Sequence, residues 1–222
     1  MVSRAIYILT ITCAAAMCVS HAGAQSTAPP DSQPAHAPSA VGAPVRPLTL
    51  GEKATLYTDR TFSVRTVLGA SFAAGLAQWR RDPREWGAGI SGYGRRDAAA
   101  YGGGLIRNTA EFSVGALLRE DPRFEPSAHN GFVARAADAL HNTLFVRTDD
   151  GGHQLAWSRA AAAVATGFAV NSWEPRRLHS THHAIVLSLG GFAGYGTGNL
   201  MHEFGPDIKR FLFHKLRIDD RM

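Results

Sequence analysis

Residues 184–201 read AIVLSLGGFAGYGTGNLM and contain no charged side chain. Gly190, Gly194 and Gly198 recur at every fourth position, so a helix would place all three on one face. Small residues on one face let a second helix approach closely, which offsets the roughly 1 kcal/mol that each glycine costs a helix relative to alanine. The pattern therefore predicts a central helix that packs its glycine face against the Ala-rich residues 160–169.

Two other interpretations of residues 184–201 stay open at this point. Eighteen uncharged residues reach the lower limit for a helix that crosses a bilayer, so the segment also fits a helix inserted in a membrane or lying on it. Gly194, Gly196 and Gly198 also alternate, which is the side-chain period of a strand. A buried core helix is the interpretation that best matches the rest of the chain.

Three further stretches share one design, in which small and apolar residues stop before an acidic residue followed by Pro-Arg. They are residues 64–79 before Asp82-Pro83-Arg84, residues 105–119 before Asp121-Pro122-Arg123, and residues 155–173 before Glu174-Pro175-Arg176. A residue that precedes proline is pushed out of the α region, so each acidic residue is expected to mark a helix end.

Two more segments show the spacing of amphipathic helices. Residues 132–146 and residues 207–216 place apolar side chains three and four positions apart, and the second segment would form a short cap on the bundle. The predicted fold class is all-α, a single bundle of five or six helices rich in small residues, after a disordered Pro/Ala-rich tether.

The N-terminus has the features of a signal peptide over residues 1–24. Arg4 precedes an uncharged apolar run, and Ala22-Gly23-Ala24 has the small-x-small pattern of a cleavage site. The apolar run is short compared with the roughly 20 residues of a membrane anchor, so we expect cleavage after Ala24. Cys13 and Cys18 both lie in this segment, so the processed chain would have no thiol for a disulfide, a metal or a nucleophile.

The remainder divides into a linker and one domain. Residues 25–47 are rich in Pro, Ala, Ser and Gln, which predicts a disordered linker. Residues 48–222 are long enough for one helical domain with a core of its own. The formal net charge of +5 falls to about +4 when Arg4 is removed, and such a balance permits binding to phosphate-rich surfaces. Together these features predict an exported protein of the periplasm or the cell-envelope membrane.

Residues 85–96, EWGAGISGYGRR, contain more glycine than a regular helix or strand is expected to hold. We expect an ordered loop packed by Trp86 and Tyr93. The alternative is a phosphate cradle, because backbone amides and guanidinium groups both favour anions. The segment lacks the Lys-Ser/Thr ending of a P-loop and does not follow a strand. The candidate anion-binding residues are Arg80, Arg81, Arg95 and Arg96.

A second candidate site is a set of histidine and acidic side chains near the C-terminus. Its members are His179, His182, His183, His202, Glu203 and Asp207. The set contains no His-Glu-x-x-His pattern, and residues 179–183 have the composition of a polar loop with a helix cap at Ser180 or Thr181. We expect solvated loop histidines, and the alternative is a metal or His/acid hydrolase site.

Other catalytic and cofactor patterns do not occur in the sequence. The processed chain has no cysteine, no Gly-x-Ser-x-Gly nucleophile motif and no Ser, His and acid set with a diagnostic spacing. Arginines are scattered without the basic stripe or aromatic platform of a nucleic-acid-binding protein. We therefore assign no catalytic residue, no cofactor, no metal and no nucleic-acid partner.

Several short motifs together resemble one family of proteins. They are Glu85-Trp86-Gly87 with Gly92-Tyr93-Gly94-Arg95-Arg96, Glu120-Asp121-Pro122-Arg123-Phe124, Arg147-Thr148-Asp149-Asp150-Gly151-Gly152, Asn171-Ser172-Trp173-Glu174-Pro175 and Glu203-Phe204-Gly205-Pro206-Asp207-Ile208-Lys209-Arg210. The combination resembles a family of uncharacterised, signal-peptide-bearing envelope proteins of Gram-negative bacteria, notably acidobacteria. The resemblance implies an envelope location and a single fold, and it carries over no activity. Gly205 departs from the family pattern, in which an aromatic residue is usual.

The functional hypothesis at this stage is an exported, membrane-associated helical envelope protein with a structural or interaction role and no assigned enzymatic activity. Its expected partners are a membrane surface or an envelope protein, and a second copy could associate through the Gly190, Gly194 and Gly198 face. The alternative is a periplasmic hydrolase that uses the histidine and acidic set.

Overall fold

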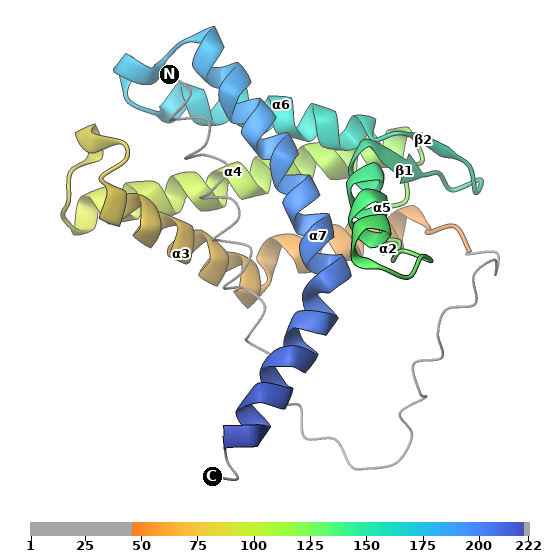
Figure 1. Ribbon diagram of the computed structural model, residues 1–222. Coiled ribbons are helices and arrows are strands. Elements are labelled where there is room, and N and C mark those ends of the chain that lie inside the picture. Colours follow the sequence, from red (N-terminus) through yellow and green to blue (C-terminus); the bar gives the residue numbers. More distant parts are fainter. Residues whose placement is uncertain (1–45, 220–222) are drawn as a thin grey trace.

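The computed structural model describes residues 46–219, with side chains as far as Phe211. The predicted signal peptide and almost all of the predicted linker lie outside the described residues. The described chain forms an α-helical bundle with one small hairpin, which confirms the predicted fold class (Figure 1).

The bundle is built from six α-helices and two short strands in the described range. The elements are α2 (Leu50–Phe62), α3 (Val64–Arg80), the 3-10 turn η2 (Arg84–Trp86), α4 (Ile90–Leu117), α5 (Phe132–Leu144), β1 (Phe145–Arg147), β2 (His153–Leu155), α6 (Trp157–Trp173), the 3-10 turn η3 (Arg176–Leu178) and α7 (Thr181–Asp219). The antiparallel strands pair Phe145 with Leu155 and Arg147 with His153.

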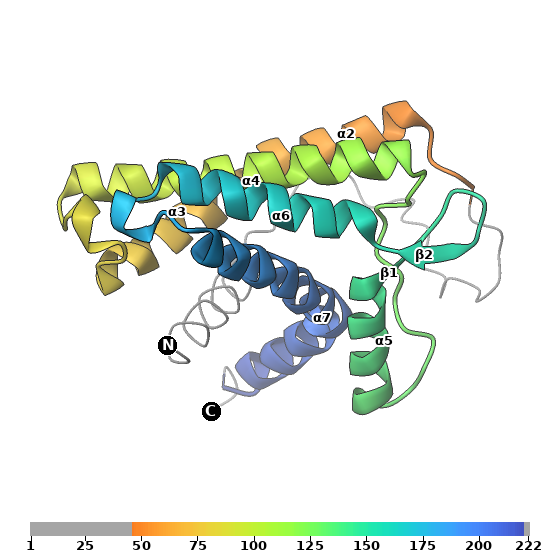
Figure 2. The same cartoon turned by 90° about the horizontal axis from the view of Figure 1, so that it is seen from above.

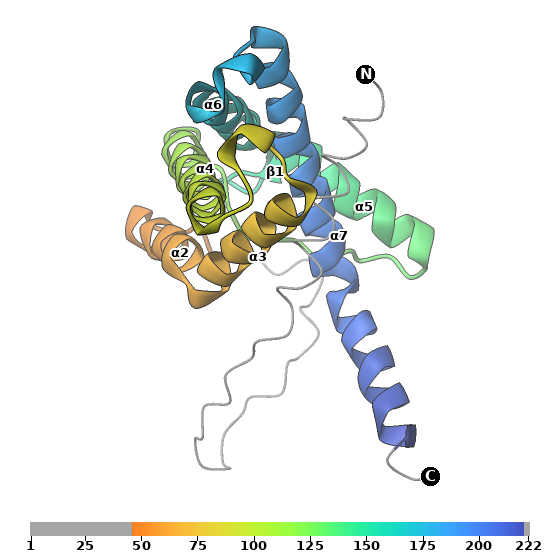
Figure 3. The ribbon, with the colours of Figure 1, turned by 90° about the vertical axis from the view of Figure 1, so that its left-hand side faces the viewer.

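Three helices lie side by side and two others cross them. Figure 2 shows α2, α4 and α6 running in similar directions, with α4 in the middle, where it contacts both neighbours. Helices α3 and α7 pack on one side of this layer, α3 against α4 and α7 against α6, as the end-on view of Figure 3 makes clear. Helix α5 packs against α7, and the C-terminal part of α7 projects beyond the other helices (Figures 1 and 3).

Two of the three predicted proline stops are found where the sequence places them, whereas α4 ends at Leu117, before the predicted Arg119. Helix α3 ends at Arg80, and Arg81 then adopts a left-handed conformation with φ of 53° directly before Asp82-Pro83. Helix α6 ends at Trp173, so Glu174 lies outside it, in extended conformation before Pro175. The steric restriction on a residue before proline explains these ends, since it disfavours the α region locally whatever the tertiary contacts are.

The Gly-rich segment 85–96 differs from its prediction, because most of it is helical. Helix α4 begins at Ile90 and runs through the glycines. A Cβ atom on Gly92 would lie 2.3 Å from the carbonyl oxygen of Trp86 and 2.6 Å from that of Gly87. Glycine is needed there for close packing of the first turn of α4 on the preceding loop, a reason that propensity does not reveal.

Three other boundaries also differ from the sequence predictions. Residues 207–216 are not a separate cap, because α7 continues through Pro206 as one helix. Helix α5 ends at Leu144, and residues 145–155 form a hairpin whose Asp-Asp-Gly-Gly turn was recognisable but whose three-residue strands were too short to predict. Helix α2 was not predicted, although Thr49 and Glu52 form a capping box at its start.

The central helix packs against α6, as predicted, but through different residues of α7. Ala184 and Ser188 lie against Gly167, where a Cβ atom would be 2.6 Å from the backbone nitrogen of Ser188 and 2.8 Å from the carbonyl oxygen of Ala184. A Cβ atom on Gly191 would lie 3.9 Å from the Cα and Cβ atoms of Ala163. By contrast, a Cβ atom on Gly198 would meet no atom within 4 Å, so Gly198 of the predicted Gly190, Gly194 and Gly198 face makes no close contact.

The core consists of small side chains. Apart from Val146, the buried apolar residues of the described chain are alanines, and Thr61 is the largest fully buried side chain. Many large apolar side chains are exposed instead; they occur on all six described helices, and α3 has the most. Among the described helices, none has both the length and the apolar character needed to cross a bilayer.

Candidate functional site

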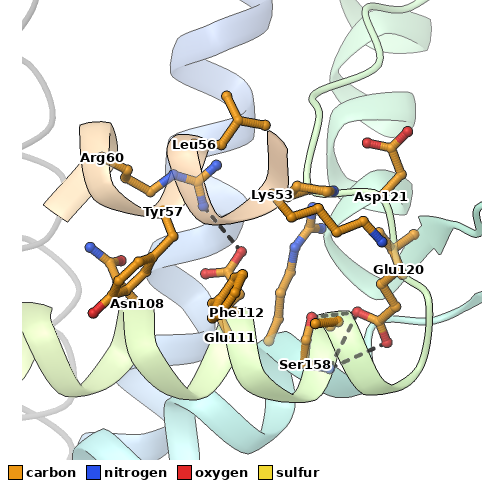
Figure 4. Close-up of a pocket in the computed structure, with 15 residues that line it drawn as sticks. Lys53, Leu56, Tyr57, Arg60, Asn108, Glu111, Phe112, Glu120, Asp121 and Ser158 are labelled. Atoms are coloured by element: carbon orange, nitrogen blue, oxygen red, sulfur yellow. Dashed lines mark hydrogen bonds and ion pairs between the residues drawn. The ribbon is translucent and has the colours of Figure 1, made fainter. Parts of the chain in front are cut away.

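A pocket with a cavity volume of about 40 Å³ lies between α2, α4 and the start of α6 and is partly open to solvent (Figure 4). Its apolar side includes Leu56, Tyr57 and Phe112, and the rings of Tyr57 and Phe112 stack with centroids 5.2 Å apart. Six charged residues also line it: Lys53, Arg60, Glu111, Glu120, Asp121 and Arg159. The pocket therefore combines an apolar wall with charged groups of both signs.

Glu120 is placed in the pocket by the way α4 ends. Arg119 adopts a left-handed conformation with φ of 56°, and the amide of Glu120 donates to the carbonyl oxygen of Gly115 at 2.8 Å. This turn buries Glu120, of which only 2% of the surface is exposed. The carboxylate accepts hydrogen bonds from the amide of Ser158 at 3.3 Å, from the Ser158 hydroxyl, and from Gln154 Nε2 at 3.3 Å.

The next residues fix one wall of the pocket through two ion pairs. Asp121 accepts hydrogen bonds from the backbone amide of Arg123 at 3.0 Å and from its Nε at 2.9 Å. Burial alone would raise the pKa of Asp121, but the hydrogen bonds and charge of Arg123, with the charge of Lys53, hold that pKa below its ordinary value. Lys53 is 6% exposed and places Nζ 2.7 Å from Asp149 Oδ2.

A second set of polar contacts, made by Arg60, Glu111 and Tyr195, joins α2, α4 and α7. Arg60 Nη1 lies 3.2 Å from Glu111 Oε1, as Figure 4 shows, and the Tyr195 hydroxyl donates to Glu111 Oε2 at 2.9 Å. Burial, reinforced by the charge of Glu111, raises the pKa of Tyr195, so this phenol stays protonated and acts as a donor. The guanidinium of Arg159 lies 5.9 Å from the centroid of the Tyr195 ring.

The histidine and acidic set predicted as an alternative site is not brought together. At the start of α7, His183 Nε2 lies 2.6 Å from Glu174 Oε2 and His179 Nε2 lies 2.6 Å from the Glu174 carbonyl oxygen, while His182 is exposed. Burial raises the pKa of Glu174 despite its hydrogen bond to His183. This end of α7 therefore holds a His–Glu contact that the sequence did not single out, because Glu174 was interpreted only as a helix stop.

The other members of that set lie far along the same helix. Arg135 binds Glu203 and Asp207, with Nε and Nη1 each 2.6 Å from a carboxylate oxygen, and the His202 ring stacks on Phe124 with centroids 5.3 Å apart. His183 and Glu203 are separated by about 30 Å of helix at 1.5 Å per residue. In the described part of the chain no three His, Cys, Asp or Glu side chains are placed to hold a metal ion. The hydrolase alternative therefore loses the geometry that it required.

The candidate anion-binding arginines divide into a buried residue and exposed ones. Arg96 is only 3% exposed and donates to the carbonyl oxygens of Asp82 at 3.0 Å, Pro83 at 2.6 Å and Gly87 at 2.9 Å. It organises the α3–α4 loop from inside and is not free to bind an anion, which corrects its assignment to the site. Arg95 is exposed.

The remaining arginines of this loop line a shallow depression. Arg80, Arg81 and Arg84 surround it together with Gly87 and Ala88. Arg80 is half-buried, and its Nη1 has no hydrogen-bond partner among the described residues. The depression therefore keeps a basic character at the end of the bundle that faces the viewer in Figure 3.

The sequence patterns did not indicate the residues of the pocket between α2, α4 and α6, because each residue was interpreted without its partners on other helices. A recognisable signal was a lone charge inside a run of small residues, as for Arg159 within residues 155–173. Such a charge is costly to bury unless other elements supply partners, so it marks a polar contact within a bundle. The partners lie on other helices, and the local pattern does not name them.

No protein-family model, curated protein or solved structure matches the chain.

Proposed function

We propose that this protein is an exported helical envelope protein that binds the surface of an anionic membrane through α3 and the α3–α4 loop, and that its role is structural or interactive and not catalytic. The observation that carries this proposal is the exposed apolar face of α3. The proposed location, in the periplasm or at the envelope membrane, rests on the signal-peptide features of residues 1–24.

The α3 face is apolar along its whole length. Val64, Leu68, Phe72 and Trp79 are 74%, 53%, 40% and 78% exposed, and their spacing places them along one side of the helix. The opposite side holds the buried Ala74 and packs against α4. A helix that buries small residues and exposes large apolar ones has a surface suited to a partner, because contiguous apolar patches are rare on isolated soluble proteins.

Charge and aromatic placement favour a lipid surface as that partner. Trp79 lies at the end of the face, next to the depression lined by Arg80, Arg81 and Arg84. Tryptophan and arginine are enriched where a helix meets lipid headgroups, and each basic residue near an anionic surface contributes about 1 kcal/mol. Of the nearby acids, Glu85 is engaged by Arg177, with Nε and Oε1 2.6 Å apart, which lowers the pKa of that carboxyl.

Co-sedimentation of the processed chain with vesicles tests the proposal. We expect binding to vesicles that contain phosphatidylglycerol, weaker binding at high salt and little binding to pure phosphatidylcholine. Trp79→Ala and Phe72→Ala should each reduce the bound fraction. Trp157→Ala is the matched control, since Trp157 is 55% exposed on α6, and it should leave binding unchanged.

Two results would overturn the proposal. One is equal recovery with neutral and anionic vesicles, or no recovery with either. The other is a stable dimer in solution that is lost in Trp79→Ala and Phe72→Ala, since the α3 face would then be an interface between copies. Cell fractionation tests the location separately, and recovery of uncleaved protein in the cytosol alone would contradict it.

A further inference from the structure

We propose that the pocket between α2, α4 and α6 is a binding site for a small zwitterion of amino-acid size, whose anionic group binds Arg159 and whose ammonium group binds Glu120. The inference is independent of membrane binding, because the pocket residues lie on elements other than the α3 face.

Polar side chains are concentrated in this pocket. The buried polar residues that line it are Lys53, Asn108, Glu120, Asp121 and Ser158, which are half of all the buried polar residues in the described chain. Burying a polar group costs free energy unless it has a partner, so a bundle with a core of alanines gains nothing from gathering them at random. Convergent polar groups beside an apolar wall are typical of a ligand pocket.

Two residues of opposite charge in the pocket, Arg159 and Glu120, have no ion-pair partner among the described residues. Lys53 pairs with Asp149 and Arg60 with Glu111, while Asp121 pairs with Arg123 outside the pocket lining. Arg159 and Glu120 line the same pocket, and within the described residues neither has an oppositely charged atom within 4.0 Å.

Arg159 keeps hydrogen-bonding capacity, and the Glu120 carboxylate, which has four hydrogen-bond contacts, has no charged donor among the described residues. Arg159 uses Nη1 alone, which donates to the carbonyl oxygens of Asn142 and Thr143, so Nε and Nη2 have no acceptor among the described residues. Glu120 accepts only from neutral donors, namely Ser158 and Gln154. A guanidinium binds a carboxylate or phosphate best through two nitrogen atoms, and a carboxylate accepts an ammonium more strongly than a neutral donor.

The charge balance selects the class of ligand. The lining charges are Lys53, Arg60 and Arg159 against Glu111, Glu120 and Asp121, which sum to zero. A ligand with net charge would leave an uncompensated charge in a partly buried site, which is costly. A molecule with one anionic and one ammonium group satisfies both free residues and keeps the balance, and a small apolar body would contact the Tyr57 and Phe112 rings.

Two sources could supply such a molecule, a free amino acid or the headgroup of an ethanolamine lipid, and titration calorimetry distinguishes them. The probes are L-valine and glycerophosphoethanolamine. The controls are 3-methylbutanoate and isobutylamine, which are valine without its ammonium and without its carboxylate. We expect millimolar or tighter binding of at least one zwitterion and at least tenfold weaker binding of both controls. Valine binding identifies the amino-acid source, and glycerophosphoethanolamine binding identifies the headgroup.

Variants of the two free residues test their roles. Arg159→Gln and Glu120→Gln should each weaken binding of the zwitterion at least tenfold, whereas Arg147→Gln, at an ion pair with Glu125 outside the pocket, should not change it. Should a pocket variant fail to fold, the melting temperature of the unaltered protein gives the second measurement, since only the zwitterion should raise it. No binding of either zwitterion at 10 mM, or equal binding of the single-charge controls, would overturn the proposal.

Discussion

Substitution of Gly167 is expected to lower the free energy of unfolding, because this residue lies where α6 and α7 approach most closely. A Cβ atom there would lie 2.2 Å from Ser188 Oγ, 2.6 Å from the Ser188 nitrogen and 2.8 Å from the Ala184 carbonyl oxygen. The serine side chain can rotate, but it would lose its hydrogen bond to Ala184 at 2.8 Å, and the two backbone atoms can move only if α6 and α7 separate. Gly167→Ala should therefore disrupt the largest helix contact of the bundle.

The size of the effect follows from two opposing terms. Overpacking a close contact costs about 1–3 kcal/mol, and backbone atoms that cannot yield place Gly167→Ala at the upper end. Replacing a helical glycine by alanine returns about 1 kcal/mol of helix propensity. We expect a net loss of about 2 kcal/mol in the free energy of unfolding, which lowers the melting temperature by about 4–8 °C in a domain of this size.

Thermal unfolding followed by circular dichroism measures the shift, and Gly198→Ala provides the control within the same bundle. A Cβ atom on Gly198 meets nothing within 4 Å, so that substitution should be neutral or stabilise by up to about 1 kcal/mol. If Gly167→Ala raised the melting temperature as much as Gly198→Ala, the close contact of α6 and α7 would be refuted. If Gly198→Ala were the damaging change, the glycine face expected from the sequence would be the real contact.

Two further predictions concern buried charges. Arg96→Gln should lower the free energy of unfolding in urea by about 3 kcal/mol or more, because several buried carbonyl oxygens lose their donor, whereas Arg95→Gln should change it by less than about 0.5 kcal/mol; equal effects would show that Arg96 does not hold the loop. Since the pKa of Asp121 is lower in the folded protein than its ordinary 3.8, its contribution is present above that value and lost as pH falls through the folded pKa. Asp121→Asn should therefore destabilise the protein at pH 6 and reduce the further loss between pH 6 and pH 3, and an unchanged pH dependence would contradict this.

Local signals predicted the helices well where a strong local constraint acted. Proline positions gave the ends of α3 and α6, because the restriction on the preceding residue does not depend on distant contacts. The local signals did not predict that α4 starts at Ile90. The low helix propensity of glycine argued against a helix there, but Gly92 is needed because the backbone of Trp86 and Gly87 lies too close for a side chain. The separate short helix expected over residues 207–216 was likewise wrong, because α7 continues through Pro206.

The candidate sites show the same limit. Each member of the histidine and acidic set was visible as a residue type, but a rise of 1.5 Å per residue separates His183 from Glu203 along one helix. The pocket residues Lys53, Glu120 and Arg159 come from distant parts of the chain, and none of them forms a motif with a sequence neighbour. Their convergence depends on how α2, α4 and α6 pack.

The sequence by itself determined that this protein is an all-α bundle, that small residues form its close contacts and that α7 packs against α6. These features follow from periodicity and backbone sterics, which act within a few residues. Only the tertiary structure decided that Ala184, Ser188 and Gly191 of α7 make the contact, that Arg96 is buried, and that unpaired charges of opposite sign share one pocket. Helix rotation and crossing angle decide these points, because they depend on the summed packing of side chains from all the helices and not on any one segment.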